Sequence, residues 1–382
     1  MRRSVLLASV LLGAAAAPAA AQSSQFGVRG IGFPAQGLSA RARGMGGALG
    51  LFDSESSLNP ASLGFVSVLT AGFVALPEWR AVANPTGDAS LRDTRFPLVL
   101  VAGPIPRRRV TLGVSFSGYA SRDFSLATAD TILLRDTPVG IFDTLSSRGG
   151  INDLRFGASL VIGEAWAVGA GFHVLTGTNR LSLRRTFEDP AYQSFSQRAE
   201  LSYAGIGASL GVIRRFGSSL SLAALVRSDG DVDVETDSTP AFSVDLPYTF
   251  GAGVLYRPSQ RLELVGHALY RTWSGANSDL VEQGAAGSAN TLELAVGAEY
   301  VGDPRRPFRR PVRLGIRYAD LPFSLHRGGG QGREIAVSLG TGTRFAAQRA
   351  GVDLALERVW RSAGEAFSES AWLLAIGVSV RP

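Results

Sequence analysis

The chain of 382 residues contains no cysteine and only three histidines. A secreted protein without cysteine cannot be cross-linked by disulfides, so another form of closure must hold its structure together. Three histidines are a small supply for metal coordination or acid–base chemistry, and they form neither a His-x-x-x-His nor a Glu-x-x-His pair. The sequence therefore predicts no metal site, no cofactor and no catalytic residues.

Lysine is also absent, so all 38 basic residues are arginines. They are scattered along the chain and form no basic helix or aromatic-basic stacking motif, so a nucleic-acid partner is not expected. Genomic base composition is the plain explanation of the arginine bias. Contact with phosphate-bearing surface lipid is the functional one, because a guanidinium group binds phosphate bidentately.

Long apolar runs are missing after the first residues of the chain. Arg2 and Arg3 precede an apolar stretch from Val5 to Leu12, and residues 19–21 are three alanines. This order is typical of a secretion signal with a small-residue cleavage site, so we expect residues 1–21 to be a signal peptide. Beyond it, nothing approaches the ~18 unbroken apolar residues of a membrane helix.

What the chain has instead is a series of short segments in which every second residue is apolar. Segments of about ten residues, tilted as in outer-membrane barrels, would cover ~25 Å of height. The sequence therefore predicts an all-β protein: a transmembrane antiparallel β-barrel of about fourteen strands, formed by residues 65–382. The predicted strands are 65–76, 96–102, 109–119, 151–162, 165–177, 198–213, 219–228, 241–256, 262–272, 290–301, 312–320, 333–343, 350–360 and 370–380.

The connections between these segments are alternately long and short. Outer-membrane barrels have long external loops and short periplasmic turns, so the pattern predicts that both termini are periplasmic. Residues 120–150 are read as an external loop. Its apolar side chains, such as Phe124 and Leu133, could gather an apolar ligand or pack into the barrel mouth.

The alternation also separates two faces of each strand. The continuous apolar faces must meet lipid, because a charge at the middle of a bilayer costs ~2–4 kcal/mol. The opposite faces combine glycine and alanine with charges of both signs, and adjacent strands place Glu293 and Glu299 near Arg313 and Arg317. This polar lining is either a network that fills and stiffens the lumen or a path for a ligand or ion. The residues predicted to face the lumen are Arg155, His173, Glu263, His267, Arg271, Glu293, Glu299, Arg313, Arg317 and Asp353.

Residues 22–64 lack the alternation and are rich in glycine, serine and alanine. Arg41-Ala42-Arg43-Gly44-Met45-Gly46-Gly47-Ala48, followed by Leu58-Asn59-Pro60-Ala61-Ser62-Leu63, resembles the N-terminal segment of FadL-like outer-membrane transporters and their PorV-like relatives. The resemblance implies a fourteen-stranded barrel in which residues 22–64 fold inside as a hatch, with Asn59, Pro60 and Ala61 in the hatch turn. It also implies a hydrophobic ligand that is released after hatch movement, often through a lateral opening at a kinked strand. The plain alternative is an ordinary turn that leads into the barrel.

These observations favour a passive outer-membrane channel for hydrophobic small molecules, such as long-chain fatty acids, in a Gram-negative-type bacterium. A PorV-like scaffold that binds proteins during secretion or surface attachment is the second hypothesis, and a general porin is the third. We expect a monomer that contacts outer-membrane lipid, lipopolysaccharide and the barrel-assembly machinery. An enzyme is not expected, since only His326 with Ser324 or Asp320 could contribute to a hydrolase site at the external rim.

Overall fold

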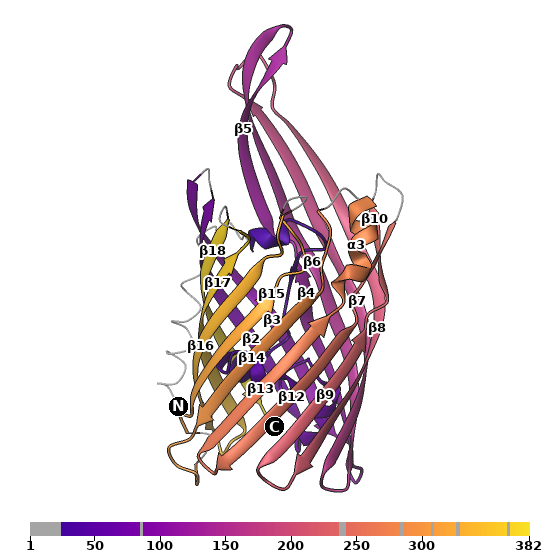
Figure 1. Ribbon diagram of the computed structural model, residues 1–382, viewed down its shortest axis with the longest axis vertical. Helices are drawn as coiled ribbons and strands as arrows, with labels where there is room; N and C mark the ends of the chain where they lie inside the picture. The colour runs from indigo at the N-terminus through magenta and orange to yellow at the C-terminus, as the bar shows by residue number, and fades with distance from the viewer. Residues whose placement is uncertain are drawn as a thin grey trace, which may run out of the picture.

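The computed structural model describes residues 24–84, 87–236, 242–282, 286–306, 309–325, 329–364 and 367–382. The predicted signal peptide and His326 lie outside the described residues. Fourteen long antiparallel strands form a closed barrel in which β18 (Ser368–Val380) pairs with β2 (Thr70–Asn84) (Figure 1). Closure leaves no open sheet edge among the wall strands, and it can hold a chain without cysteine together in a membrane.

Every one of the fourteen predicted strands overlaps a wall strand, so the predicted strand number and fold class are confirmed. The other wall strands are β3 (Gly87–Pro104), β4 (Val110–Ser121), β6 (Thr137–Ile162), β7 (Trp166–Phe187), β8 (Phe195–Phe216), β9 (Leu220–Ser228), β12 (Thr249–Ser259), β13 (Leu262–Arg271), β14 (Thr291–Tyr300), β15 (Val312–Asp320), β16 (Arg333–Phe345) and β17 (Ala350–Ser362). Each of them pairs with its neighbours around the barrel.

Strand β14 shows how alternation separates the two faces of the wall. The side chains of Leu292, Leu294 and Val296 point outward and are 38%, 45% and 60% exposed. Glu293 and Ala295 lie between them and are buried on the inner side. The outward apolar side chains suit contact with lipid, whereas the inner side can carry charge. The described residues contain no helix with the length and apolar character that crossing a membrane requires.

Residues 120–150, predicted to be an external loop between two strands, instead contain regular strand structure. Strand β5 (Phe124–Leu134) pairs with an extension of β6, and this hairpin projects far above the other strands together with the ends of β7 and β8 (Figure 1). The hairpin turns at Arg135 and Asp136, whose φ angles are 51° and 61°. Two consecutive positive φ values define a tight hairpin turn that usually contains glycine or asparagine, so this turn lacked a recognisable sequence signal.

Several predicted strand boundaries are also wrong, since β2, β3, β6 and β7 are longer than predicted, and two further differences have a local cause. The first strand begins at Thr70 and not at residue 65, because residues Pro60–Phe65 form the 3-10 helix η3. The predicted strand 241–256 is two strands, β11 (Phe242–Asp245) and β12. Strand β11 pairs with β10 (Asp231–Thr236), which itself pairs with β8, so these two short strands continue the ladders of β9 and β12; Pro247 stands between β11 and β12. Proline cannot donate to a ladder, which accounts for the break.

The remaining elements are short. The N-terminal segment, residues 24–65, contains η1 (Gln25–Gly27), β1 (Phe33–Pro34), α2 (Ala40–Gly44), η2 (Ala48–Leu51) and η3. Between β13 and β14 the chain forms η4 (Trp273–Ala276) and α3 (Asn277–Glu282). We use "long-loop end" for the end of the barrel with the β5–β6 hairpin and "short-turn end" for the opposite end, where the C-terminus lies (Figure 1).

Candidate functional site: the barrel lumen

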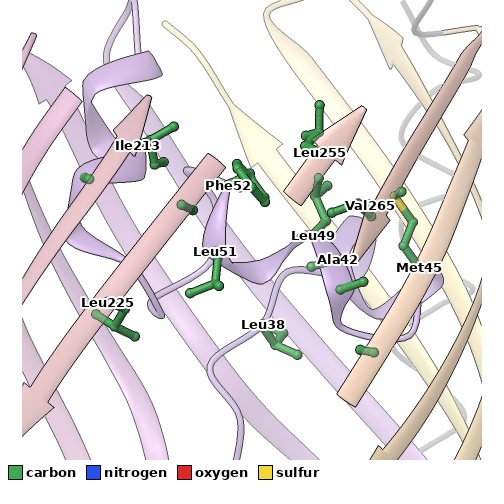
Figure 2. Close-up of a cluster of buried hydrophobic side chains, with 14 of the residues drawn as sticks. Leu38, Ala42, Met45, Leu49, Leu51, Phe52, Ile213, Leu225, Leu255 and Val265 are labelled. Atoms are coloured by element: carbon green, nitrogen blue, oxygen red, sulfur yellow. The ribbon is translucent and has the colours of Figure 1, made fainter. Parts of the chain in front are cut away.

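The N-terminal segment packs against the inner side of the barrel wall. Met45 and Leu51 of this segment are fully buried, and they join one apolar cluster with Leu225, Leu255 and Leu269 of strands β9, β12 and β13. Figure 2 shows side chains of the segment directed toward those of the strands around them. The segment therefore forms a hydrophobic core with the wall inside the lumen.

Wall glycines make this close packing possible. A Cβ atom at Gly315 of β15 would lie 2.0 Å from the carbonyl carbon of Met45, and one at Gly169 of β7 would lie 2.4 Å from the carbonyl carbon of Pro60. Because these are backbone atoms, a change of side-chain rotamer could not relieve the overlap. The glycines on the inner faces are therefore where the segment's backbone touches the wall.

The predicted hatch turn is a hydrogen-bonded corner. Asn59 is fully buried; its Oδ1 accepts from the backbone N–H of Ala61 at 3.0 Å, and its Nδ2 donates to the carbonyl of Leu51 at 3.0 Å. Pro60 occupies the first position of η3, where its missing N–H leaves no bond unmade. The corner lies against β7 and β8, since a Cβ at Gly211 would overlap the Asn59 side chain.

Ion pairs fasten the segment as well. Arg41 contacts Glu299 at 2.8 Å, and Arg43 contacts Glu357 at 3.1 Å. The carboxylate of Glu55 accepts hydrogen bonds from two arginines of the short-turn end, Arg344 and Arg381, at 3.3 and 3.0 Å. Burial raises the pKa of Glu55 above its ordinary value. The segment is therefore held both by apolar contacts and by charges of the wall.

The ten residues predicted to face the lumen lie on the inner side of the wall, and all but Arg271 are buried. Arg313 pairs with Glu299 and Asp353, each at 2.6 Å, as expected for the first of these pairs. Arg317 was expected near Glu293, but it pairs with Glu334 of β16, at 2.7 Å. Glu263 pairs with Arg257 at 2.6 Å, and Glu293 lies 3.3 Å from His267 and 3.2 Å from Arg271. A role of these residues in ligand passage stays a prediction.

The sequence prediction missed a second ionic cluster near the closure of the barrel. Arg361 of β17 pairs with Glu334 at 2.6 Å and with Glu369 of β18 at 2.5 Å, and Glu78 of β2 pairs with Arg80 and Arg95. These charges stand at alternate, inward positions of their strands. The same alternation that identified the other lumen residues would have found them.

Three neighbouring strands are joined by Asp153, His173 and Ser209. His173 is fully buried; its Nδ1 lies 2.9 Å from Asp153 and its Nε2 lies 2.8 Å from Ser209. The order resembles a hydrolase triad, but Ser209 is 2% exposed and does not border the cavity described below. Beside it, Arg155 donates to the carbonyl of Ser57 at 2.7 Å, which ties this part of the wall to the segment. The described residues include no group of three or more His, Asp or Glu side chains that could hold a metal ion.

A cavity of about 160 Å³ lies inside the barrel, between the N-terminal segment and the long-loop end. Residues of the segment from Gly32 to Leu38 border it on one side. Leu225, Leu269 and Trp273 give it apolar walls, and charged side chains of β9, β13, β14 and β15 give it polar ones. It also reaches Leu76 and Pro97, on strands β2 and β3.

The wall is irregular at this point. Val74 of β2 pairs with Leu98 of β3, but Leu76 pairs with Arg95, so β3 holds one extra residue there. Such a bulge bends the strand and leaves part of the ladder unpaired. The cavity therefore meets the wall at a local break in its hydrogen bonds.

No protein-family model and no curated protein sequence matches the chain. Solved structures do match it. A FadL homologue of Pseudomonas aeruginosa has a TM-score of 0.64 at 14% identity and covers 91% of this chain and 99% of its own. The toluene transporter TbuX of Ralstonia pickettii has a TM-score of 0.56 at 14% identity, with 91% and 98% covered. The toluene transporter TodX of Pseudomonas putida has a TM-score of 0.56 at 12% identity, with 91% and 99% covered. The chain therefore has the FadL-like outer-membrane transporter fold that its N-terminal motif suggested.

Proposed function

We propose that this protein is an outer-membrane channel for the passive uptake of hydrophobic small molecules, such as monoaromatic compounds or long-chain fatty acids. The observation that carries the proposal is the internal cavity that meets the wall at Leu76 and Pro97, where the β2–β3 ladder is broken. Two structural neighbours, TbuX and TodX, are toluene transporters, which supports the same class of cargo. The host would be a Gram-negative-type bacterium.

A ligand would leave the cavity sideways, between β2 and β3. Pro77 and Pro97 lie on these strands and have no N–H to donate to the ladder. The β18–β2 ladder is interrupted at the same height, between the pairs Glu78–Leu373 and Ala75–Ile376. Fewer hydrogen bonds must break for this part of the wall to open, and an apolar cargo would pass directly into lipid.

The packing of the lumen argues against a general porin. A water-filled pore needs an open path, whereas the N-terminal segment occupies the lumen and its side chains are fully buried at Ala42, Met45 and Leu51. A solute that crossed the barrel from end to end would have to displace this apolar core. Sideways release from the cavity requires no such displacement.

An engineered disulfide across the β2–β3 break tests the proposal. The chain has no cysteine, so only introduced thiols can react. Phe73 and Val99 are cross-strand partners beside the bulge, and both point outward. Phe250 of β12 and Val226 of β9 form an equivalent outward pair on a regular ladder and provide a matched control. Partner residues of a ladder lie close enough for a disulfide.

The assay is the uptake of radiolabelled ethylbenzene and oleate by cells whose own channels for these compounds have been deleted. We expect oxidation of the Phe73→Cys/Val99→Cys variant to stop uptake, reduction to restore it, and the control pair to transport in both states. Equal uptake by the oxidised test and control pairs would refute sideways release. Failure of the wild-type chain to take up either compound, together with co-purification of secretion partners, would favour the scaffold hypothesis.

A further inference from the structure

Four polar side chains form a row at one height of the cavity wall. Register pairs Arg227 of β9 with Thr249 of β12, Thr249 with Arg271 of β13, and Arg271 with Thr291 of β14. All four border the cavity, and so does Trp273, two residues beyond Arg271. The row and Trp273 together therefore present hydroxyl, guanidinium and indole groups to one side of the cavity.

Three donors in this group have no hydrogen-bond partner within the part of the chain that the structure describes. They are the Nη2 of Arg227, the indole Nε1 of Trp273 and the hydroxyl of Thr291. Trp273 and Thr291 are 3% and 2% exposed, so protein rather than bulk solvent surrounds them. A buried donor without an acceptor is unfavourable, and a ligand atom that accepts a hydrogen bond would relieve this penalty.

The charges beside the row indicate what kind of acceptor fits. Arg227 is held by Asp229 at 2.7 Å and by Asp153 at 2.8 Å, and Arg271 is held by Glu293 at 3.2 Å. Each guanidinium therefore already has a carboxylate partner. An anionic ligand would add a further negative charge among three carboxylates in a poorly solvated space. A neutral oxygen would accept the same hydrogen bonds without that repulsion.

The adjoining part of the cavity is apolar. Leu225 and Leu269 lie one inward position closer to the short-turn end than the row, on either side of Gly251. Both are buried members of the cluster that includes Leu51 of the N-terminal segment. The volume of about 160 Å³ is close to that of an apolar protein cavity, roughly 150 Å³, known to hold benzene.

We propose that the cavity selects hydrophobic molecules that carry a neutral oxygen acceptor, such as aromatic ketones or esters, over hydrocarbons and carboxylates of the same size. The ring lies against Leu225 and Leu269, and the oxygen accepts from Trp273 and Thr291. This inference rests on the proposed function, because it specifies the cargo of the same cavity.

The test uses three probes of similar size: ethylbenzene without an acceptor, acetophenone with a neutral one, and benzoate with an anionic one. Binding is measured by equilibrium dialysis against the purified protein in lipid nanodiscs, with empty nanodiscs to subtract partitioning into lipid. Trp273→Phe removes the indole N–H and keeps a ring against Phe323, which Trp273 contacts at a centroid distance of 5.1 Å. Thr291→Val removes the hydroxyl at nearly constant shape. Ser115→Ala is the matched control, since Ser115 carries a buried hydroxyl without a partner among the described residues and does not border the cavity.

We expect wild-type protein to bind acetophenone more tightly than ethylbenzene or benzoate. Each of the Trp273 and Thr291 variants should weaken acetophenone binding about threefold to tenfold, the range for one hydrogen bond, and should change ethylbenzene binding by a smaller factor. The Ser115 variant should match wild type. Tighter binding of benzoate, or unchanged acetophenone binding in both donor variants, would overturn the inference but leave the proposed function in place, provided that ethylbenzene still binds. If none of the probes binds, the inference fails. Uptake of ethylbenzene or oleate by cells that carry the wild-type chain then decides separately whether the proposed function fails with it.

Discussion

Replacing Gly315 with alanine tests how the N-terminal segment is seated in the lumen. The added Cβ would lie 2.0 Å from the carbonyl carbon of Met45 and 2.1 Å from the backbone nitrogen of Gly46. Non-bonded heavy atoms do not approach this closely, and β15 is held on both sides by β14 and β16. Because the strand is fixed by two ladders, the segment and not the wall must move.

The size of the effect follows from what the segment loses. Insertion of one methyl group into a well-packed core costs about 1–3 kcal/mol, and full loss of the burial of Met45 would cost a similar amount. Since 1.4 kcal/mol is tenfold in an equilibrium constant, the population with a displaced segment should rise by roughly 5- to 140-fold. The barrel itself should stay closed, because its ladders do not depend on this contact.

Single-channel recording in planar bilayers measures that population as the frequency of ion-conducting openings. We expect Gly315→Ala to open at least about fivefold more often than wild type. Gly266→Ala on β13 is the control, since its added Cβ would have no atom outside its neighbouring residues closer than 3.6 Å. Heat-modifiable migration in gels checks that both variants form barrels. If both variants are folded and show equal opening frequencies, the segment does not rest on Gly315 and the account of the lumen given above is wrong.

Three other substitutions test individual contacts. Asn59→Ala removes both side-chain hydrogen bonds of the buried corner and should lower the free energy of local opening by about 1–3 kcal/mol. Protease cleavage within residues 24–65 should become faster, and cleavage at the wild-type rate would contradict the role of this corner. Arg43→Met leaves the buried Glu357 with Arg317 at 3.8 Å as its remaining ion-pair partner and should destabilise the protein by about 1–3 kcal/mol in urea, whereas Arg43→Met/Glu357→Gln should recover most of the loss. Ser209→Ala removes one bond to His173 and should cost about 1 kcal/mol without changing uptake, and labelling of the wild-type serine by a fluorophosphonate would disprove a purely structural role.

The barrel could be predicted from the sequence because a membrane imposes a simple pattern. Every wall strand must alternate between lipid and lumen, so the period of two survives in sequences as different as β7 and β14. Away from the wall strands this constraint ends. The β5–β6 hairpin turns at Arg135-Asp136, and η3 begins at Pro60 after its cap residue Asn59, where local backbone conformation decides the structure.

The candidate site was predictable only in part. Alternation identifies which side chains face inward, but ion pairs depend on register, which the sequence does not specify. In the structure, Glu299 lies directly opposite Arg313, whereas Glu293 lies opposite Ala319. Arg317 is therefore two residues, or one inward position, away from the point opposite Glu293. The cavity and the contacts of the N-terminal segment depend on backbone approach at glycines, for which a single sequence carries no distance information.

The ion pairs of Arg41 indicate what displacement of this side chain from the wall would cost. Arg41 of the N-terminal segment pairs with Glu299 and Glu263, but each of these carboxylates has a second partner in the wall: Arg313 at 2.6 Å for Glu299 and Arg257 at 2.6 Å for Glu263. Displacement of Arg41 would leave no unpaired carboxylate on the wall, and Arg41 itself is already 31% exposed. For Glu299 and Glu263 the large penalty for an isolated buried charge is thereby avoided. The ion pairs of Arg41 therefore oppose displacement of the segment less than the buried pair of Arg43 with Glu357 does.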